Sequence, residues 1–149
     1  MRGKIAEALK TAQKAQDKGL VSTLRMVSAA IQDRDIANRG SGKGAASDDE
    51  ILQILTKMVK QRQESAKAFE DGKRPELAAQ ENAEIAIISK FLPSQMDDSE
   101  ARAAIGQVIR DVGATSARDM GKVMAELKAK YAGRMDFGKA SGIVKGLLQ

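Results

Sequence analysis

The stretch Asp119-Met120-Gly121-Lys122-Val123-Met124 decides how the second half of this chain folds. Met120, Val123, Met124 and Leu127 fall at positions i, i+3, i+4 and i+7, a spacing that lays apolar side chains along one side of an α-helix. Ser116 precedes this stripe, and Asp119 comes three residues after Ser116, which is the spacing of a helix-capping box. We therefore predict an amphipathic helix that begins near Ser116.

A second helix is predicted after the break Tyr131-Ala132-Gly133-Arg134-Met135-Asp136, which combines a helix-stopping glycine with a capping acid. The apolar stripe of this second helix consists of Phe137, Ala140, Val144, Leu147 and Leu148. The segment from Thr115 to Leu148 is thus expected to form a helical hairpin.

Three glycines, Gly138, Gly142 and Gly146, recur every four residues on this last helix and leave one of its faces without side chains. Such a face allows close approach of either another helix or a sugar-phosphate backbone. Because the glycines border the apolar stripe, we expect close packing of a helix.

Composition narrows the functional classes. The 149 residues contain no cysteine and no histidine, so thiolate metal sites and the commonest general base are excluded. We accordingly predict no catalytic, cofactor-binding or metal-binding residues. Apolar runs are too short for a membrane span and no secretion signal is visible, so we expect a cytoplasmic protein with no membrane partner.

The rest of the chain predicts an all-α fold in two domains. Residues 1–93 show four helical patterns, of which the first should stop near Gly19 and the fourth should run to Phe91-Leu92-Pro93. Ser47 to Glu50 has the spacing of a capping box. A break at Pro93 then separates an N-terminal helical bundle of about four helices from a three-helix tail domain at 94–149.

Two groups of polar residues are weighed as chemical sites. The glycine-rich loop from Gly40 to Ala46 lacks the order of a phosphate-binding loop and is expected to be a linker. Carboxylates of the third and fourth helices could converge, but without histidine they do not complete a di-metal motif, and we expect a solvated acidic face. These carboxylates are Glu64, Glu70, Glu81 and Glu84.

The basic residues of the closing hairpin are the strongest functional candidates. The net charge is +5, and the two ends of the chain are positive while the middle is negative. Long cationic side chains on a stiff helical surface suit phosphate recognition, although they also serve simply as solubilising groups. The RNA-binding candidates are Gly121, Lys122, Lys128, Lys130, Arg134, Lys139 and Lys145.

Four stretches together resemble the YqeY family, also known as the GatB/YqeY domain. They are Leu24 to Ile31, Lys60 to Ser65, Ala83 to Ile85 leading to Phe91-Leu92-Pro93, and Asp119 to Met124. The family is similar in turn to the C-terminal tail region of the GatB polypeptide of the glutamyl-tRNA(Gln)/aspartyl-tRNA(Asn) amidotransferase.

The resemblance implies a helical bundle followed by a small tail that engages tRNA, with amide transfer left to other domains. It predicts a non-catalytic module that binds tRNA or another folded RNA, with a protein of the translation apparatus as a further partner. Two alternatives stay open: an interaction module without RNA binding, and an accessory to a carbon-nitrogen ligase that uses glutamine as amido-N-donor. No catalytic constellation supports an enzymatic role for the chain alone.

Overall fold

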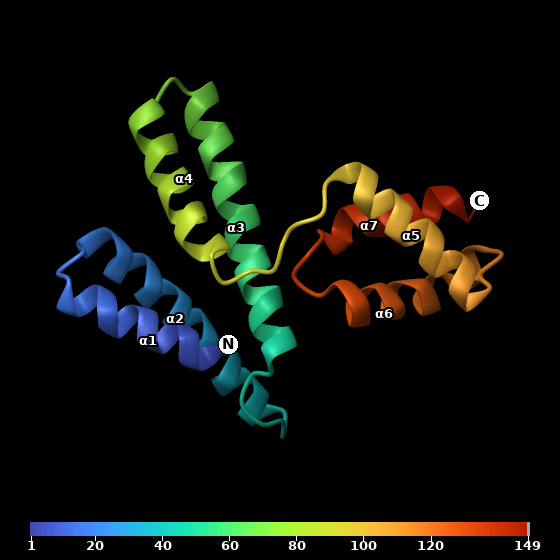
Figure 1. The fold of residues 1–149 in the computed structure, drawn as a ribbon, viewed down its shortest axis with the longest axis horizontal. Helices are drawn as coiled ribbons and strands as arrows, with labels where there is room; N and C mark the ends of the chain where they lie inside the picture. Colours follow the sequence, from blue (N-terminus) through green and yellow to red (C-terminus); the bar gives the residue numbers. More distant parts are fainter. Residues whose placement is uncertain (149) are drawn as a thin grey trace. The chain divides into compact units, whose positions relative to one another are not determined.

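The computed structural model describes residues 1–148, and these fold into seven α-helices and one short 3-10 helix without a strand (Figure 1). The expected all-α class is therefore confirmed. The chain divides into two compact units, Met1–Pro93 and Ser94–Gln149, and Gln149, the last residue of the expected tail, lies outside the described range. Each unit has its own buried cluster of apolar side chains.

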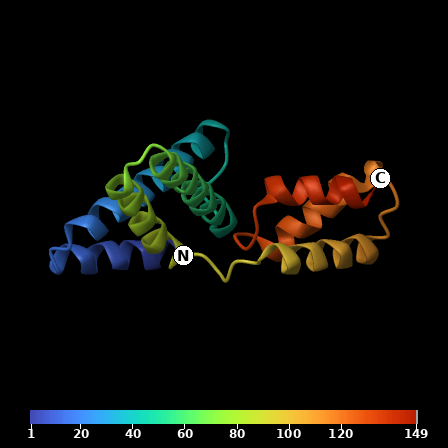
Figure 2. The same cartoon turned by 90° about the horizontal axis from the view of Figure 1, so that it is seen from above.

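The first unit consists of two helical hairpins. Helix α1 (Arg2–Lys14) pairs with α2 (Lys18–Gly40), and α3 (Asp48–Asp71) pairs with α4 (Pro75–Ser89) (Figures 1 and 2). Helix α2 also packs on α3 and α4 and so joins the two hairpins. The core between them is Ile5, Val27, Ile31, Ala46, Ile51, Leu55, Met58 and Ile88.

The turn between α1 and α2 comes earlier than predicted. Helix α1 ends at Lys14, and Gly19, expected as its stop, lies in the first turn of α2. Gln16 takes a left-handed conformation (φ 55°), and the Asp17 side chain accepts a hydrogen bond from the Leu20 amide. The capping acid thus starts α2 before the glycine is reached.

The caps of the second hairpin agree with the sequence, but its last helix is shorter. Ser47 and Glu50 form the predicted capping box of α3, and Pro75 occupies the first turn of α4. Helix α4 ends at Ser89 instead of continuing to Pro93. The amides of Phe91 and Leu92 instead bond to the carbonyl groups three residues back, and Leu92, which directly precedes Pro93, is disfavoured in the α conformation.

Among residues 1–93, one charged side chain is buried, that of Asp35, where the sequence indicated none. Asp35 is 8% exposed and accepts hydrogen bonds from both terminal nitrogens of Arg2 (2.9 Å each) and from the Ala46 amide (2.7 Å). The Arg2 guanidinium, followed by the Ala46 amide, lowers the pKa of the Asp35 carboxyl to about 2. The carboxylate therefore fastens the start of α1 and the loop after α2 to α2 itself.

The second unit contains three α-helices and a 3-10 turn. They are α5 (Asp98–Val112), η1 (Ala117–Asp119), α6 (Met120–Tyr131) and α7 (Phe137–Leu147). All three α-helices contact one another. Their shared core is Ala101, Ala104, Ile105, Val108, Val123, Leu127, Met135, Ala140, Val144 and Leu148.

Local signals explain where these helices begin and end. Asp97 accepts a hydrogen bond from the Glu100 amide at the start of α5, and Gly113 ends that helix in a left-handed conformation (φ 68°) that favours glycine. Ser116 and Asp119 form the predicted capping box, but the box opens the 3-10 turn and α6 itself starts at Met120. The amides of Thr115 and Ser116 donate to Asp119 and lower the pKa of its carboxyl.

The predicted apolar stripe of α7 is wrong at one position. Ala140, Val144 and Leu148 are buried, whereas Leu147 is 54% exposed. Leu147 lies one residue, or about 100°, from both Leu148 and the glycine at 146, so it falls beyond the edge of the buried face. This exposed leucine borders the glycine-rich face of the same helix.

Candidate functional site

The seven predicted RNA-binding residues all belong to the second unit, but they do not form one surface. Lys122 and Lys128 of α6 are both exposed, and they are six residues apart. Six residues at about 100° each leave them about 120° apart around the helix axis. They therefore point in different directions, and Gly121 is exposed beside them with open space at its Cα.

Carboxylates neutralise part of this charge. Lys130 Nζ lies 3.4 Å from Glu126 Oε1 and 3.9 Å from Asp111 Oδ2. Lys122 is close enough to Asp119 for its charge to contribute to the lowered pKa of that acid. Of the basic residues of α6, Lys130 takes part in ion pairs, whereas neither Lys122 nor Lys128 forms one with another residue in the range 1–148.

Arg134 has a structural position in the turn between α6 and α7. Its Nε donates a hydrogen bond to the Ser94 carbonyl oxygen (3.0 Å), and its guanidinium carbon lies 5.8 Å from the centre of the Tyr131 ring. Both residues are half-buried. The Tyr131 ring therefore has an arginine over its face.

The glycine-rich face of α7 is open, which corrects the expected helix packing. Within residues 1–148, a Cβ atom added to Gly142 or to Gly146 would meet no atom within 4 Å, so no helix of this range packs there, and Gly138 at the start of the face is exposed as well. The reason is that Ala140, Val144 and Leu148 bury the other side of the helix in the core of the unit. Residues 142 and 146 consequently present bare backbone to solvent.

Lys139 and Lys145 flank this open face. Gly142 is three residues from each of them, so the lysines lie on either side of it on the helix surface. Both lysines are exposed, and neither forms an ion pair among residues 1–148. The backbone of α7 is thus accessible between two cations.

A groove of about 640 Å³ runs between this face and α5. It is lined by Asp98 and Arg102 of α5 and by Lys139, Gly142, Ile143, Gly146 and Leu147 of α7. Sequence reasoning missed Arg102, because it used only the apolar stripe of α5. The position of Arg102 one residue after the buried Ala101, at the edge of that stripe, was the signal that could have identified it.

A second polar cluster lies in the first unit and corrects the expected solvated acidic face at one position, Glu84, whereas Glu64 and Glu70 are exposed as expected. Arg62 Nε donates to Glu84 Oε2 (2.9 Å), Nη1 donates to the Met58 carbonyl (3.2 Å), and Nη2 lies 3.6 Å from the Met26 sulfur. Glu84 is therefore a partly buried ion-pair partner, not a solvated carboxylate. The contacts join three of the stretches that carry the family resemblance, those containing Met26, Arg62 and Glu84.

Among residues 1–148, no three carboxylates gather closely enough to hold a metal ion, and no helix is both long and apolar enough to cross a membrane. The ionisable side chains of the second unit are instead distributed over its surface.

Comparison with known proteins identifies several relatives. A Clavispora lusitaniae protein named altered inheritance of mitochondria protein 41, mitochondrial, is 28% identical over 143 residues, which are 94% of this chain and 80% of that protein. The Saccharomyces cerevisiae protein of the same name is 30% identical over 92 residues, 62% of this chain and 48% of that protein. An uncharacterized protein of Schizosaccharomyces pombe is 29% identical over 89 residues, 60% of this chain and 69% of that protein.

Two of these relatives carry mitochondria in their names, which contradicts the cytoplasmic location expected from the sequence. The names state no reaction, ligand or partner. The family itself is identified by a family model, described as YqeY, Yqey-like protein, which matches residues 2–148 of this chain. This chain therefore belongs to the YqeY family.

Proposed function

We propose that the second unit is a non-catalytic module that binds folded RNA, such as tRNA, through its phosphate groups. The observation that carries the proposal is the open backbone of Gly142 and Gly146 between Lys139 and Lys145, which form no ion pair among residues 1–148. Arg102 extends the same positive surface onto α5 across the groove.

The chemistry of RNA suits such a surface. Lysine and arginine neutralise phosphates and release counterions, which supplies most of the affinity for a nucleic acid that is read by shape. A helix face without side chains lets the sugar-phosphate backbone come close to the peptide groups, which a face covered by long side chains prevents. Neither interaction requires an aromatic platform, so the arginine over Tyr131 does not conflict with the proposal.

The proposed contact set is narrower than the one predicted from sequence. It retains Lys139 and Lys145, adds Arg102, and gives Lys130 and Arg134 structural roles, because their charged groups already have protein partners. Three further candidates lie on α6 and would contact a large RNA only at the margin of this surface; they are Gly121, Lys122 and Lys128. Any amide-transfer chemistry would belong to other proteins.

The test is a titration of unfractionated tRNA against the full chain at several salt concentrations. The triple variant Arg102→Gln, Lys139→Gln, Lys145→Gln should weaken binding and lower the slope of log affinity against log salt by roughly one for each lost phosphate contact. Lys130→Gln is the matched control from the same unit, and it should leave the slope nearly unchanged because carboxylates already offset its charge.

Failure of the wild-type chain to retard tRNA at about 50 mM salt would reject RNA binding altogether, since phosphate contacts are strongest at low salt. Equal effects of the triple variant and of Lys130→Gln would reject the assigned surface. Co-purification of a defined protein that survives nuclease treatment and is lost in the triple variant would favour a protein-binding role for the same surface instead.

A further inference from the structure

A second groove, in the first unit, has the chemistry of a site for a small amphiphile. Its volume is about 670 Å³, and it lies between α1, α2 and the segment that ends α4. Leu24 forms its floor and is completely buried. The groove is separate from the RNA surface proposed above, because all of its lining residues belong to Met1–Pro93.

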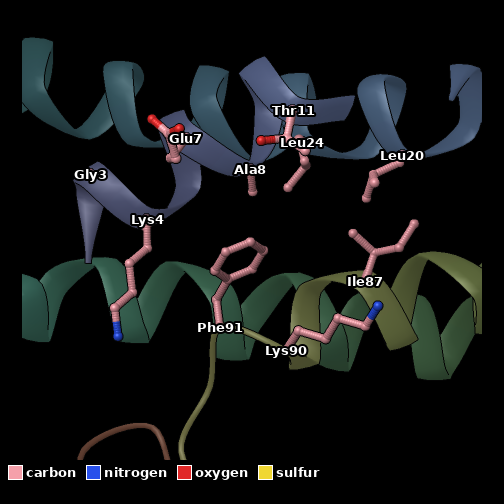
Figure 3. A pocket seen from close by; sticks show the side chains of 10 residues that line it. All are labelled: Gly3, Lys4, Glu7, Ala8, Thr11, Leu20, Leu24, Ile87, Lys90 and Phe91. Atoms are coloured by element: carbon pink, nitrogen blue, oxygen red, sulfur yellow. The ribbon is translucent and has the colours of Figure 1, made fainter. Parts of the chain in front are cut away.

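Apolar side chains from both hairpins make the walls. Figure 3 shows Ile87 and Phe91 rising from the end of the second hairpin toward Ala8, Leu20 and Leu24 of the first. Ala8, Leu20, Ile87 and Phe91 are only partly buried, so this apolar surface is reached from solvent. The space stays open because Ala8, opposite Phe91, is too small to fill it.

Two lysines stand at the rim. Lys4 of α1 and Lys90, just after α4, are exposed, and neither forms an ion pair or a side-chain hydrogen bond among residues 1–148. In Figure 3 the two ammonium groups lie on opposite sides of Phe91, and the Glu7 carboxylate points away from Lys4. The groove is therefore lined by two cations, Lys4 and Lys90, and by one carboxylate, that of Glu7, which leaves its rim with a net positive charge.

The size of the groove suits a small molecule. Volumes of about 300–1,000 Å³ are usual for small-ligand sites, and such sites combine apolar walls with a few polar groups that orient the ligand. An α-helix with its side chains is about 10–12 Å across and needs several turns of matching groove, whereas a single alkyl chain needs one slot. Positive charge at the mouth selects an anionic head group.

We propose that this groove binds a single-chain fatty acid. The alkyl chain lies against Leu20, Ile87 and Phe91. The positive charges of Lys4 and Lys90, on opposite sides of Phe91, attract the carboxylate to the rim. No bond is made or broken, and the occupied groove covers apolar surface that is otherwise in contact with water.

The test is isothermal titration of laurate, below its micelle concentration, into the full chain. Saturable binding of one laurate is expected, with no binding of acetate, which lacks the chain, and at least about tenfold weaker binding of dodecyltrimethylammonium, which has the same chain and the opposite charge. Binding of both twelve-carbon amphiphiles with equal affinity would overturn the role of the lysines. Absence of laurate binding would overturn the proposal.

Paired variants locate the site. Lys4→Glu with Lys90→Glu should weaken laurate binding at least about tenfold, whereas Lys57→Glu with Lys67→Glu, the same charge change on exposed positions of α3, should not. Ala8→Phe should fill the groove and abolish binding, whereas Ala6→Phe on an exposed position of the same helix should not. Equal effects within either pair would place laurate elsewhere and overturn the assignment of this groove.

A second copy of the chain is the other possible occupant of the groove. Sedimentation of the protein with and without laurate distinguishes it from the fatty acid. A monomer at both conditions agrees with the proposal. A dimer that Ala8→Phe dissociates, and that laurate leaves intact, would assign the groove to a second copy of the chain and overturn it.

Discussion

Arg62 and Glu84 form an ion pair of 2.9 Å that joins α3 to α4. Their side chains are only 13% and 17% exposed. The second guanidinium nitrogen of Arg62 is occupied by the Met58 carbonyl and the third by the Met26 sulfur. The Arg62 side chain therefore connects three helices, and removal of the ion pair should lower the free energy of unfolding.

Glu84→Ala should destabilise the first unit by about 2 kcal/mol, because it leaves the Arg62 guanidinium partly buried without its carboxylate. Chemical denaturation of the full chain measures this. Combining Glu84→Ala with Arg62→Met in a double-mutant cycle should give a coupling energy of about 0.5–3 kcal/mol. Additive single effects would mean that the two side chains do not stabilise each other.

The carboxylate of Asp35 should make the first unit sensitive to acid. Its folded pKa of about 2 lies below the ordinary value of 3.8, so the ionised form is favoured by folding. That contribution is complete above about pH 4 and is lost as the pH falls toward the folded value. The free energy of unfolding should therefore decrease between about pH 4 and pH 2.

Asp35→Asn is the matched variant for this prediction. It keeps the shape of the side chain but not its charge, so it should be less stable than the wild type at neutral pH and should lose less stability on acidification. Some dependence on pH remains, since Arg34 also lowers the pKa of Glu50. Parallel curves for the two proteins between about pH 4 and pH 2 would contradict the assignment to Asp35.

Gly142→Ala should separate stability from function. Residue 142 lies in the interior of α7 with open space at its Cα, so alanine should raise stability by about 0.5–1 kcal/mol through its higher helix propensity. If RNA approaches the backbone there, the same variant binds tRNA more weakly. Thermal melts and tRNA titrations measure the two effects, and unchanged tRNA affinity would exclude close backbone approach at this residue.

The same leucine-to-alanine substitution at two positions of the second unit should lower the free energy of unfolding by very different amounts. Leu127→Ala removes a completely buried side chain and should destabilise the unit by about 2–5 kcal/mol. Leu147→Ala acts on a side chain that is 54% exposed and should cost less than about 1 kcal/mol. Comparable losses in denaturant titrations would show that Leu147 packs in solution as the sequence pattern predicted.

Short-range signals in the sequence already determined most of the secondary structure. The capping acids and hydroxyls at Ser47, Asp97 and Asp136 act on amides two or three residues away, so their effects can be inferred without knowing the fold. The apolar spacing of Val123 and Leu127 likewise identified the buried face of α6. The all-α class follows from these local interactions.

Partners that are distant along the chain were decided only by tertiary packing. Asp35 meets Arg2 across 33 residues and Arg62 meets Glu84 across 22, and no periodicity marks such pairs. The candidate site changed for the same reason: whether a lysine is available depends on which acids the neighbouring helices bring to it, as Asp111 shows for Lys130. The glycine face of α7 was visible in the sequence, but whether a helix covers it depended on how three helices share one core.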